Sequence, residues 1–352
     1  MYPGRHYHRL QNGKIQCDLC PRECQLQEGQ AGLCFVRQRQ QDQIVLNTYG
    51  RSSGFCIDPI EKKPLYHFYP GTSVLSFGTA GCNLTCSFCQ NWSISKSRQL
   101  ETAARNASPL AIARAAHQNQ CKSVAYTYND PVIFLEYAVD VAQACRELGI
   151  KNVAVSAAYI NAGARTEFFA WMDAANVDLK GFSELFYKQY CSARLAPVLE
   201  SLQYIYHETN CHLEITNLVI PGANDDPADL EKMCQWIVNH LGADVPLHFS
   251  AFHPDYKLRD RPRTPARTLL RARQIAEKCG LHYCYTGNIV APQSQSSRCH
   301  QCGQPLVQRD GYQIIGYQLD EQGRCQHCQT SIPGRFQGQP GEWGNRRLSI
   351  QI

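Results

Sequence analysis

Three cysteines lie close together in one short stretch of the chain, at Cys82, Cys86 and Cys89. Their C-x3-C-x2-C spacing, directly after a short apolar run, places three thiolates on one loop, and such loops hold metal centres. The odd number is informative, because a closed structural zinc site takes four protein ligands. Three thiolates around a four-iron cluster leave one iron open to a ligand from outside the protein. The alternatives are three buried cysteines without a metal, or three zinc ligands with a fourth elsewhere.

Two further groups of cysteines flank this loop. The C-terminal group forms two C-x2-C pairs with 22 residues between them, a pattern typical of a four-thiolate zinc-ribbon or rubredoxin-like site. It predicts zinc, with a redox iron that feeds electrons to the loop as the alternative. The N-terminal group has the less usual spacing C-x2-C-x3-C-x9-C and predicts a second metal site, either zinc or an iron–sulfur cluster, with free thiols as the alternative. The members of the two groups are Cys17, Cys20, Cys24 and Cys34, and Cys299, Cys302, Cys325 and Cys328.

Composition limits the functional classes. The chain has 352 residues, 19 cysteines, 18% charged residues and a formal net charge of +5. No signal peptide or membrane span is visible, so this many cysteines indicate a reducing compartment, and we expect a cytoplasmic protein without a membrane partner. The weak positive charge neither argues for nor excludes a nucleic-acid partner. The other eight cysteines are scattered through periodic segments and are expected to be buried small hydrophobic residues.

The elements that must position the loop alternate between strand and helix. From residue 71 to 290 the pattern predicts about six βα units, including a strand over 123–126 and helices over 109–118 and 167–174. Repeated units of this kind favour an α/β fold, a partial (β/α)6 TIM-like barrel, with a doubly wound sheet as the alternative. Residues 1–70 are predicted to form a Cys-rich segment with few periodic elements. Residues 291–352 are predicted to form the four-cysteine module, joined by a polar linker over 291–298.

Polar side chains follow nearly every predicted strand at its carboxyl end. In a barrel these ends converge on one mouth, where functional residues collect. The candidates, taken along the chain, are Asn129, Asp130, Ser156, Asn161, Asp178, Lys180 and His253.

The cysteine loop, including the aromatic Phe88 before its last cysteine, resembles the signature of the radical S-adenosylmethionine (SAM) enzymes. The resemblance implies a 4Fe–4S cluster whose open iron binds the amino and carboxylate groups of SAM. One electron, from a donor such as flavodoxin or ferredoxin, then cleaves SAM to methionine and a 5′-deoxyadenosyl radical.

A pocket for SAM needs acceptors for an ammonium and a ribose, and a cation for a carboxylate. Asn129 and Asp130 are candidates for the ammonium and ribose side, and Lys180 for the carboxylate. Asp178 is expected to accept from ribose or to fix Lys180. Ser156 and Asn161 are plausible ribose or carboxylate contacts, and His253 is either a donor to the ligand or a hydrogen-bonded core histidine.

Two longer resemblances refine this interpretation. Asp178-Leu-Lys180 and Leu218–Gly222 resemble the pyruvate formate-lyase activating enzymes, which abstract hydrogen from a glycine of a partner enzyme. Nearly the whole chain resembles the AmmeMemoRadiSam group of radical SAM proteins, through Tyr126–Pro131 and Phe252–Leu258. Asp130 stands where that group has glutamate, and the Gly-Gly-Glu run of the activating enzymes is absent from the sequence.

The sequence therefore predicts a radical SAM oxidoreductase, activating-enzyme-like, that acts on a protein or other macromolecule. The alternatives are a radical SAM enzyme that modifies a small molecule, and a non-enzymatic zinc protein that binds nucleic acid.

Overall fold

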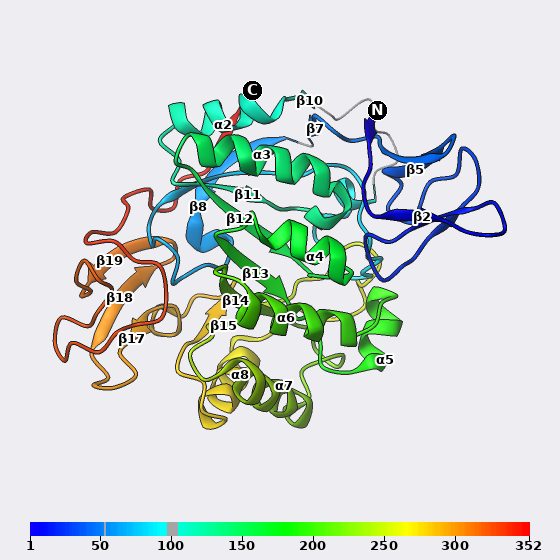
Figure 1. Ribbon diagram of the computed structural model, residues 1–352. Coiled ribbons are helices and arrows are strands. Elements are labelled where there is room, and N and C mark those ends of the chain that lie inside the picture. The colour runs from blue at the N-terminus through cyan, green and yellow to red at the C-terminus, as the bar shows by residue number, and fades with distance from the viewer. Residues whose placement is uncertain (53, 97–104) are drawn as a thin grey trace.

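A sheet of nine strands forms the centre of the molecule in the computed structural model, which describes residues 1–52, 54–96 and 105–352 (Figure 1). Seven neighbouring strands are parallel and follow one another in chain order: β9 (Ser73–Phe77), β11 (Ser123–Tyr126), β12 (Lys151–Ser156), β13 (Ala174–Asp178), β14 (His212–Val219), β15 (Leu247–Ala251) and β16 (Cys284–Gly287). Two further strands extend the sheet beyond β9. Strand β8 (Phe55–Pro59) pairs antiparallel with β9, and β20 (Leu348–Ile350) pairs antiparallel with β8.

Helices cover one face of this sheet (Figure 1). They are α2 (Pro109–Gln118), α3 (Leu135–Glu147), α4 (Ala162–Phe169), α6 (Ala196–Glu208), α7 (Pro227–Leu241) and α8 (Ala266–Lys278). A doubly wound sheet reverses its strand order at a switch point, whereas the order here runs in one direction. The doubly wound alternative is therefore wrong, and the open sequential sheet is the arrangement of an incomplete barrel.

Local signals account for several boundaries. Helix α2 begins at Pro109 because the Ser108 side chain accepts a hydrogen bond from the backbone N–H of Ala111. The predicted helix over 167–174 is wrong, because α4 ends at Phe169 and β13 begins at Ala174. Pairing of β13 with strands on both sides outweighs the helical preference of its alanines.

The segment before β9 closes the amino end of the barrel. Backbone N–H groups of Tyr66 and His67 donate to the buried carboxylate of Glu214 on β14, at 3.0 and 2.7 Å. The side chain of Asn176 on β13 donates to the carbonyl of Pro64 at 2.8 Å. This segment therefore forms a floor beneath the strands, which leaves their carboxyl ends as the accessible end.

The first fifty residues contain more strand than predicted. They form two small antiparallel sheets, β2-β3-β4 and β1-β6-β5. Their bounds are β1 (Tyr2–Pro3), β2 (Tyr7–Arg9), β3 (Ile15–Cys17), β4 (Gln25–Leu26), β5 (Arg37–Gln40) and β6 (Gln43–Leu46). Strands of two to four residues give little periodicity, which is why the pattern missed them. A buried ion pair between Arg37 and Glu136, with nitrogen–oxygen distances of 2.7 and 3.0 Å, fixes this part to α3.

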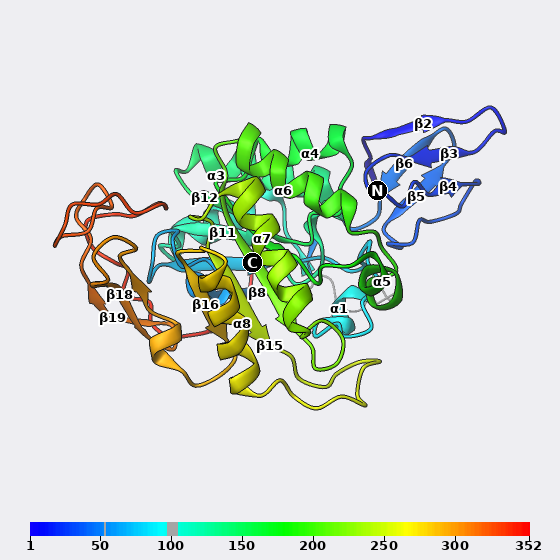
Figure 2. The same cartoon turned by 90° about the horizontal axis from the view of Figure 1, so that it is seen from below.

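The C-terminal cysteines belong to a module built on β17 (Ser297–Arg298), β18 (Pro305–Asp310) and β19 (Gln313–Tyr317). The buried guanidinium of Arg309 donates to the carbonyl of Tyr66 at 2.7 Å, which fixes the module against the barrel floor. The expected polar linker over 291–298 is partly buried, with Ser294 and Ser297 nearly inaccessible. Figures 1 and 2 show this module and the N-terminal sheets at opposite ends of the molecule.

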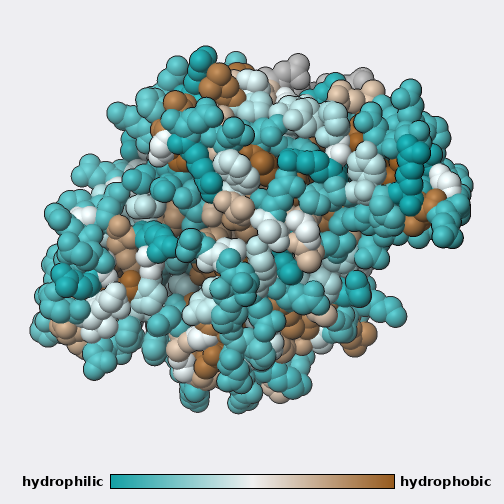
Figure 3. Space-filling model, viewed as in Figure 1, coloured by the Kyte–Doolittle hydropathy of each residue, from teal (hydrophilic) through white to brown (hydrophobic). Residues whose placement is uncertain are grey.

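The face of the molecule seen in Figure 3 is largely hydrophilic, with small scattered apolar areas. Among the described residues, no helix has the length and apolar character that crossing a membrane requires.

Candidate functional site

A cavity of about 240 Å³ lies at the carboxyl ends of the parallel strands. Its wall combines the cysteine loop with residues at or near the carboxyl ends of β11, β12, β13, β14 and β15. Nine of the residues singled out in the sequence line it: Cys82, Cys86, Phe88, Cys89, Asn129, Asp130, Ser156, Asp178 and Lys180.

The chain between β9 and the first cysteine is held by the side chain of Asn129. Its amide oxygen accepts from the N–H of Thr79 at 3.1 Å, and its amide nitrogen donates to the carbonyl of Gly81 at 2.8 Å. Gly78 must be glycine, because a Cβ there would lie 2.4 Å from the carbonyl oxygen of Thr127. Asn129 therefore lies at the cavity but uses its amide to shape the loop.

The three loop thiols differ in their surroundings. Burial raises the pKa of Cys82 to about 11, and the neighbouring carboxylate of Asp130 adds to the rise. Contact with the thiol of Cys191, and then burial, raise the pKa of Cys86 well above its usual value. The sulfur of Cys89 lies 3.2 Å from the hydroxyl oxygen of Ser95. A metal centre must therefore displace protons from these thiols when it binds.

The spacing of the three sulfurs bears on the kind of centre they could hold. Among the described residues, the groups of three or more ligand atoms within 4.8 Å of one another do not include this set. Thiolates around one zinc ion are about 3.8 Å apart, as tetrahedral bonds of about 2.3 Å require. The three sulfurs are thus not gathered around one point as the ligands of a single zinc ion are, and thiols are the donors that an iron–sulfur cluster takes.

Cys191 is a residue of this site that the sequence analysis assigned to the core. It ends a short π-helical turn (Tyr187–Cys191) whose carbonyls accept from the loop, Tyr190 from the N–H of Ser87 at 2.9 Å and Cys191 from that of Thr85 at 3.2 Å. No spacing rule connects residues 86 and 191, so the sequence offered no signal for this contact.

Asp130 is the most enclosed acid of the cavity. Its carboxylate accepts from the hydroxyl of Ser156 at 2.8 Å and from the N–H groups of Ala157 and Val132 at 3.1 and 3.2 Å. Burial raises its pKa, and these three donors offset only part of the rise. Oδ1 accepts from two of these donors and Oδ2 from only one, so Oδ2 keeps a lone pair with which the group can receive a cationic ligand.

Lys180 and Asp178 form an ion pair on another part of the cavity wall. The ammonium of Lys180 donates to the carboxylate of Asp178 at 2.8 Å, and both line the cavity. Burial would lower the pKa of Lys180, but Asp178 and the thiols of Cys86 and Cys191 raise it well above its usual value. The lysine is therefore a permanent cation next to the loop.

Asn161 and His253 do not line this cavity. The side chain of Asn161 donates to the carbonyl of Asp18 at 3.0 Å and so contacts the N-terminal part of the chain. His253 is exposed and its Nδ1 lies 3.2 Å from the amide of Gln90. The segment that contains His253 covers the outer side of the loop, where the N–H of Lys257 donates to the carbonyl of Ser87 at 3.1 Å.

Among the lining residues that were not candidates, three lie on β14 and β15: Thr216, Leu218 and Ser250. Thr216 and Leu218 alternate along β14 and so share its inner face. That period-two signal was present in the sequence, but it does not distinguish the inner face of a strand from the outer one.

The two flanking cysteine groups have different geometry. The four C-terminal sulfurs all lie within 4.8 Å of one another, with Cys299–Cys328 at 3.6 Å and Cys302–Cys325 at 3.8 Å. These distances match the tetrahedral spacing around one ion. The four N-terminal cysteines line a common cavity, but their sulfurs are not gathered in this way.

Comparisons with known proteins agree with this geometry. The family model described as the radical SAM superfamily matches residues 77–237, which include the loop and most of the cavity wall. An uncharacterized protein of Methanocaldococcus jannaschii is 38% identical over 333 residues, covering 94% of this chain and 99% of that relative. The chain belongs to the radical SAM superfamily.

Other relatives connect this radical SAM protein with the activating enzymes, as the sequence resemblance implied. The pyruvate formate-lyase-activating enzyme of Clostridium pasteurianum is 22% identical over 204 residues, covering 54% of this chain and 84% of that enzyme. A crystal structure of a radical SAM methyltransferase from Sphaerobacter thermophilus has a TM-score of 0.48 at 14% identity, covering 86% of this chain and 80% of that one. Residues 262–338 match the model described as the bacterial peptidase A24 N-terminal domain.

Proposed function

We propose that this radical SAM protein cleaves SAM at a cluster held by Cys82, Cys86 and Cys89 and abstracts hydrogen from a protein or other macromolecule. When bound, the cluster and SAM supply a 5′-deoxyadenosyl radical, and the chain supplies binding, orientation and exclusion of water. The observation that carries the proposal is one cavity whose wall combines three thiols with the buried carboxylate of Asp130 and the partly buried ammonium of Lys180.

The charges of the cavity complement those of an amino acid. The carboxylate of Asp130 has capacity for a further donor and suits the ammonium of SAM, with Ser156 fixing its orientation. The ammonium of Lys180, held by Asp178, suits the carboxylate of SAM. Both groups are within the wall that carries Cys82 and Cys86, so a ligand held between them would lie against the loop.

The size of the cavity favours a macromolecular substrate over a small one. Sites for drug-sized ligands have volumes of roughly 300–1,000 Å³, whereas this cavity has about 240 Å³ before a cluster and SAM enter it. Little enclosed space is left for a second small molecule. The substrate would therefore present its reacting atom at the mouth, as a segment of a larger chain can do.

The C-terminal module is proposed to be a structural zinc site of the ribbon type. Its sulfur distances suit one ion, and its contacts lie at the barrel floor, away from the loop. This position argues against the alternative of a redox iron that feeds the loop.

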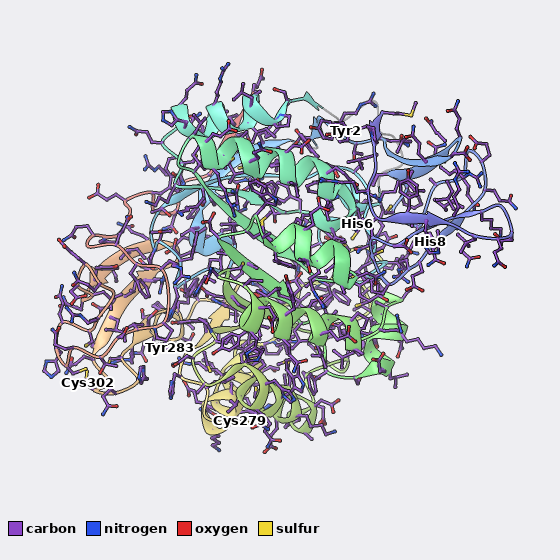
Figure 4. The ribbon with its side chains drawn as sticks, viewed as in Figure 1. Tyr2, His6, His8, Cys279, Tyr283 and Cys302 are labelled. Carbon is purple, nitrogen blue, oxygen red and sulfur yellow. The ribbon has the colours of Figure 1, made fainter. Side chains whose placement is uncertain are left out.

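The decisive experiment is anaerobic reconstitution of the chain with iron and sulfide, followed by dithionite and SAM. We expect 5′-deoxyadenosine and methionine by mass spectrometry from the wild type and from Cys279→Ala. Cys279 directly follows the C-terminal end of α8, its sulfur contacts the carbonyl of Glu231, and it does not line the cavity, so it serves as the matched control (Figure 4). Cys86→Ala should give neither product. Absence of deoxyadenosine from the iron-loaded wild type would contradict the proposal, and zinc without iron would favour the non-enzymatic alternative.

A further inference from the structure

The four N-terminal cysteines converge on one small cavity, although they come from three separate turns. Cys17 ends β3, Cys20 and Cys24 lie in the connection between β3 and β4, and Cys34 lies in the turn before β5. Three of them are buried and Cys24 is half-buried. Four thiols that line one cavity are typical of the ligands of a metal centre and are not expected from ordinary core packing.

Burial raises the pKa of the Cys20 thiol and raises that of Cys34 to about 11, and backbone N–H groups offset part of each rise. The N–H of Arg22 donates to the sulfur of Cys20, and the N–H groups of Val36 and Arg37 donate to that of Cys34. Phe35 has a φ of 68°, a left-handed conformation that turns these amides toward the sulfur. Residue Gln329, which follows Cys328 in the C-terminal module, has a comparable φ of 63°. The residue that follows the last cysteine therefore has the same left-handed backbone conformation in both groups.

Spacing distinguishes the two groups. The C-terminal sulfurs are collected within 4.8 Å, whereas among the described residues no three of the N-terminal sulfurs form such a group. One zinc ion requires the closer arrangement, and an iron–sulfur cluster holds its four thiolates farther apart because the iron and sulfide core lies between them.

A buried cation faces the same cavity. Arg37 is 1% exposed, lines the cavity, and lies close enough to Cys17 and Cys34 to interact with their charges. Its Nε is buried and has no hydrogen-bond partner among the described residues, while its other nitrogens bind Glu136 and the carbonyl of Arg5. The carboxylate of Glu136 already pairs with this guanidinium, and a thiolate-bound anionic cluster would be a second partner that accepts from the unused Nε–H.

The N-terminal thiols adjoin the catalytic loop. A Cβ on Gly81, the residue before Cys82, would lie 2.1 Å from the carbonyl oxygen of Cys34. The guanidinium of Arg22 donates to the carbonyl of Asn83 at 2.8 Å, and Asn83 also lines the N-terminal cavity. The segments that carry the two cysteine sets are therefore in direct contact with each other.

We propose that Cys17, Cys20, Cys24 and Cys34 hold a second 4Fe–4S cluster that passes single electrons to the cluster of the loop. In each transfer the N-terminal cluster is oxidised by one electron and the loop cluster is reduced by one electron. A low-potential one-electron donor of the flavodoxin or ferredoxin class restores the N-terminal cluster. The relay rests on the proposed function, whereas the presence of the second cluster does not.

The test counts metal in three forms of the full chain, reconstituted anaerobically with iron and sulfide and with zinc present. We expect about eight irons per chain in the wild type, because each site holds about four. The triple variant Cys82→Ala, Cys86→Ala, Cys89→Ala should keep about four, and so should the double variant Cys20→Ser, Cys34→Ser. Electron paramagnetic resonance of the reduced proteins should show two signals in the wild type and a different single signal in each variant.

Iron that disappears completely in the triple variant, or an N-terminal set that instead carries zinc, would overturn the second cluster. The triple variant cannot cleave SAM, so its retained iron supports the second cluster whatever becomes of the proposed activity.

Cys24→Ser tests the relay. It changes the half-buried ligand, so it can be used if the double variant fails to fold. With reduced flavodoxin as donor, freeze-quench spectra should show at least tenfold slower reduction of the loop cluster in Cys24→Ser, and an unchanged rate would overturn the relay.

Discussion

At the scale of single residues, the cavity separates side chains that shape the loop from those that can contact a ligand. The amide of Asn129 forms its hydrogen bonds with the backbone of residues 79–81. Asp130 and Lys180 also line the cavity, and both can form a further hydrogen bond with a zwitterionic ligand. The sequence predicted the types and the common location of these residues from their positions after strands. It could not assign their roles, because a hydrogen bond across 50 residues leaves no local pattern.

Lys180→Met tests the proposed carboxylate contact. Loss of a charge-assisted contact of about 1.5–3 kcal/mol predicts roughly 10- to 100-fold weaker SAM binding, with the iron content unchanged. Equilibrium binding of SAM to the reconstituted protein measures this, with the exposed Lys188→Met as control. Equal affinity in Lys180→Met and the wild type would remove Lys180 from the binding site.

Cys191→Ala tests whether the additional thiol beside Cys86 is a ligand. The proposed cluster takes three protein thiolates, so we expect Cys191→Ala to keep its full iron and sulfide content, whereas Cys86→Ala loses that of the loop cluster. Chemical analysis of iron in the two variants, side by side, decides the point. A loss of iron in Cys191→Ala similar to that in Cys86→Ala would show that the loop is closed by a fourth thiolate.

At the scale of elements, the predictions of a helix over 109–118 and a strand over 123–126 are confirmed, because Ser108 and Pro109 mark the start of α2 and β11 is mostly apolar and buried. The predictions failed at the α4–β13 boundary, where β13 pairs with β12 and β14, and in the first fifty residues, where Tyr2 of β1 pairs with Leu46 of β6. The contacts of the floor segment with Glu214 and with the C-terminal module join residues 147 and 266 positions apart, so no local pattern in the sequence indicates them.

His67 in the floor predicts a pH dependence of stability. Burial lowers its pKa to about 4, and its ring lies between the carbonyl of Pro333 at 2.7 Å and the hydroxyl of Tyr285 at 2.6 Å. Between pH 6.5 and 4 the unfolded chain binds a proton that the folded chain does not, so stability present above pH 6.5 is lost as the pH falls. The loss is about 2 kcal/mol between pH 6.5 and 5.

Thermal unfolding at pH 7 and pH 5 measures this effect. The decrease in the midpoint should be smaller in His67→Gln than in the wild type, because glutamine does not titrate. The exposed His117→Gln should behave as the wild type does. An identical decrease in all three proteins would mean that His67 makes no contribution.

At the scale of the whole molecule, two cysteine groups of similar size lie at opposite ends of one sheet (Figures 1 and 2). The N-terminal group adjoins the loop at the carboxyl ends of the strands, and the C-terminal group lies beyond the floor at their amino ends. The sequence predicted both groups but not their placement, because each is attached through contacts with residues far away in the chain. Because the two groups lie at opposite ends of the strands, we expect substitutions in them to have different effects.

Cys302→Ala tests this division of roles, since Cys302 lies in the outer part of the C-terminal module (Figure 4). Its sulfur is 3.8 Å from that of Cys325, so the substitution should remove about one zinc per chain and lower the thermal midpoint, because a structural zinc site contributes to folding. Iron content and the yield of 5′-deoxyadenosine per folded protein should stay at the wild-type level, as they should in the control Cys279→Ala. Metal analysis and product quantification on the same sample compare the two. A parallel loss of iron or of deoxyadenosine in Cys302→Ala would mean that the C-terminal site communicates with the loop, and the assignment of that module as a structural support would be wrong.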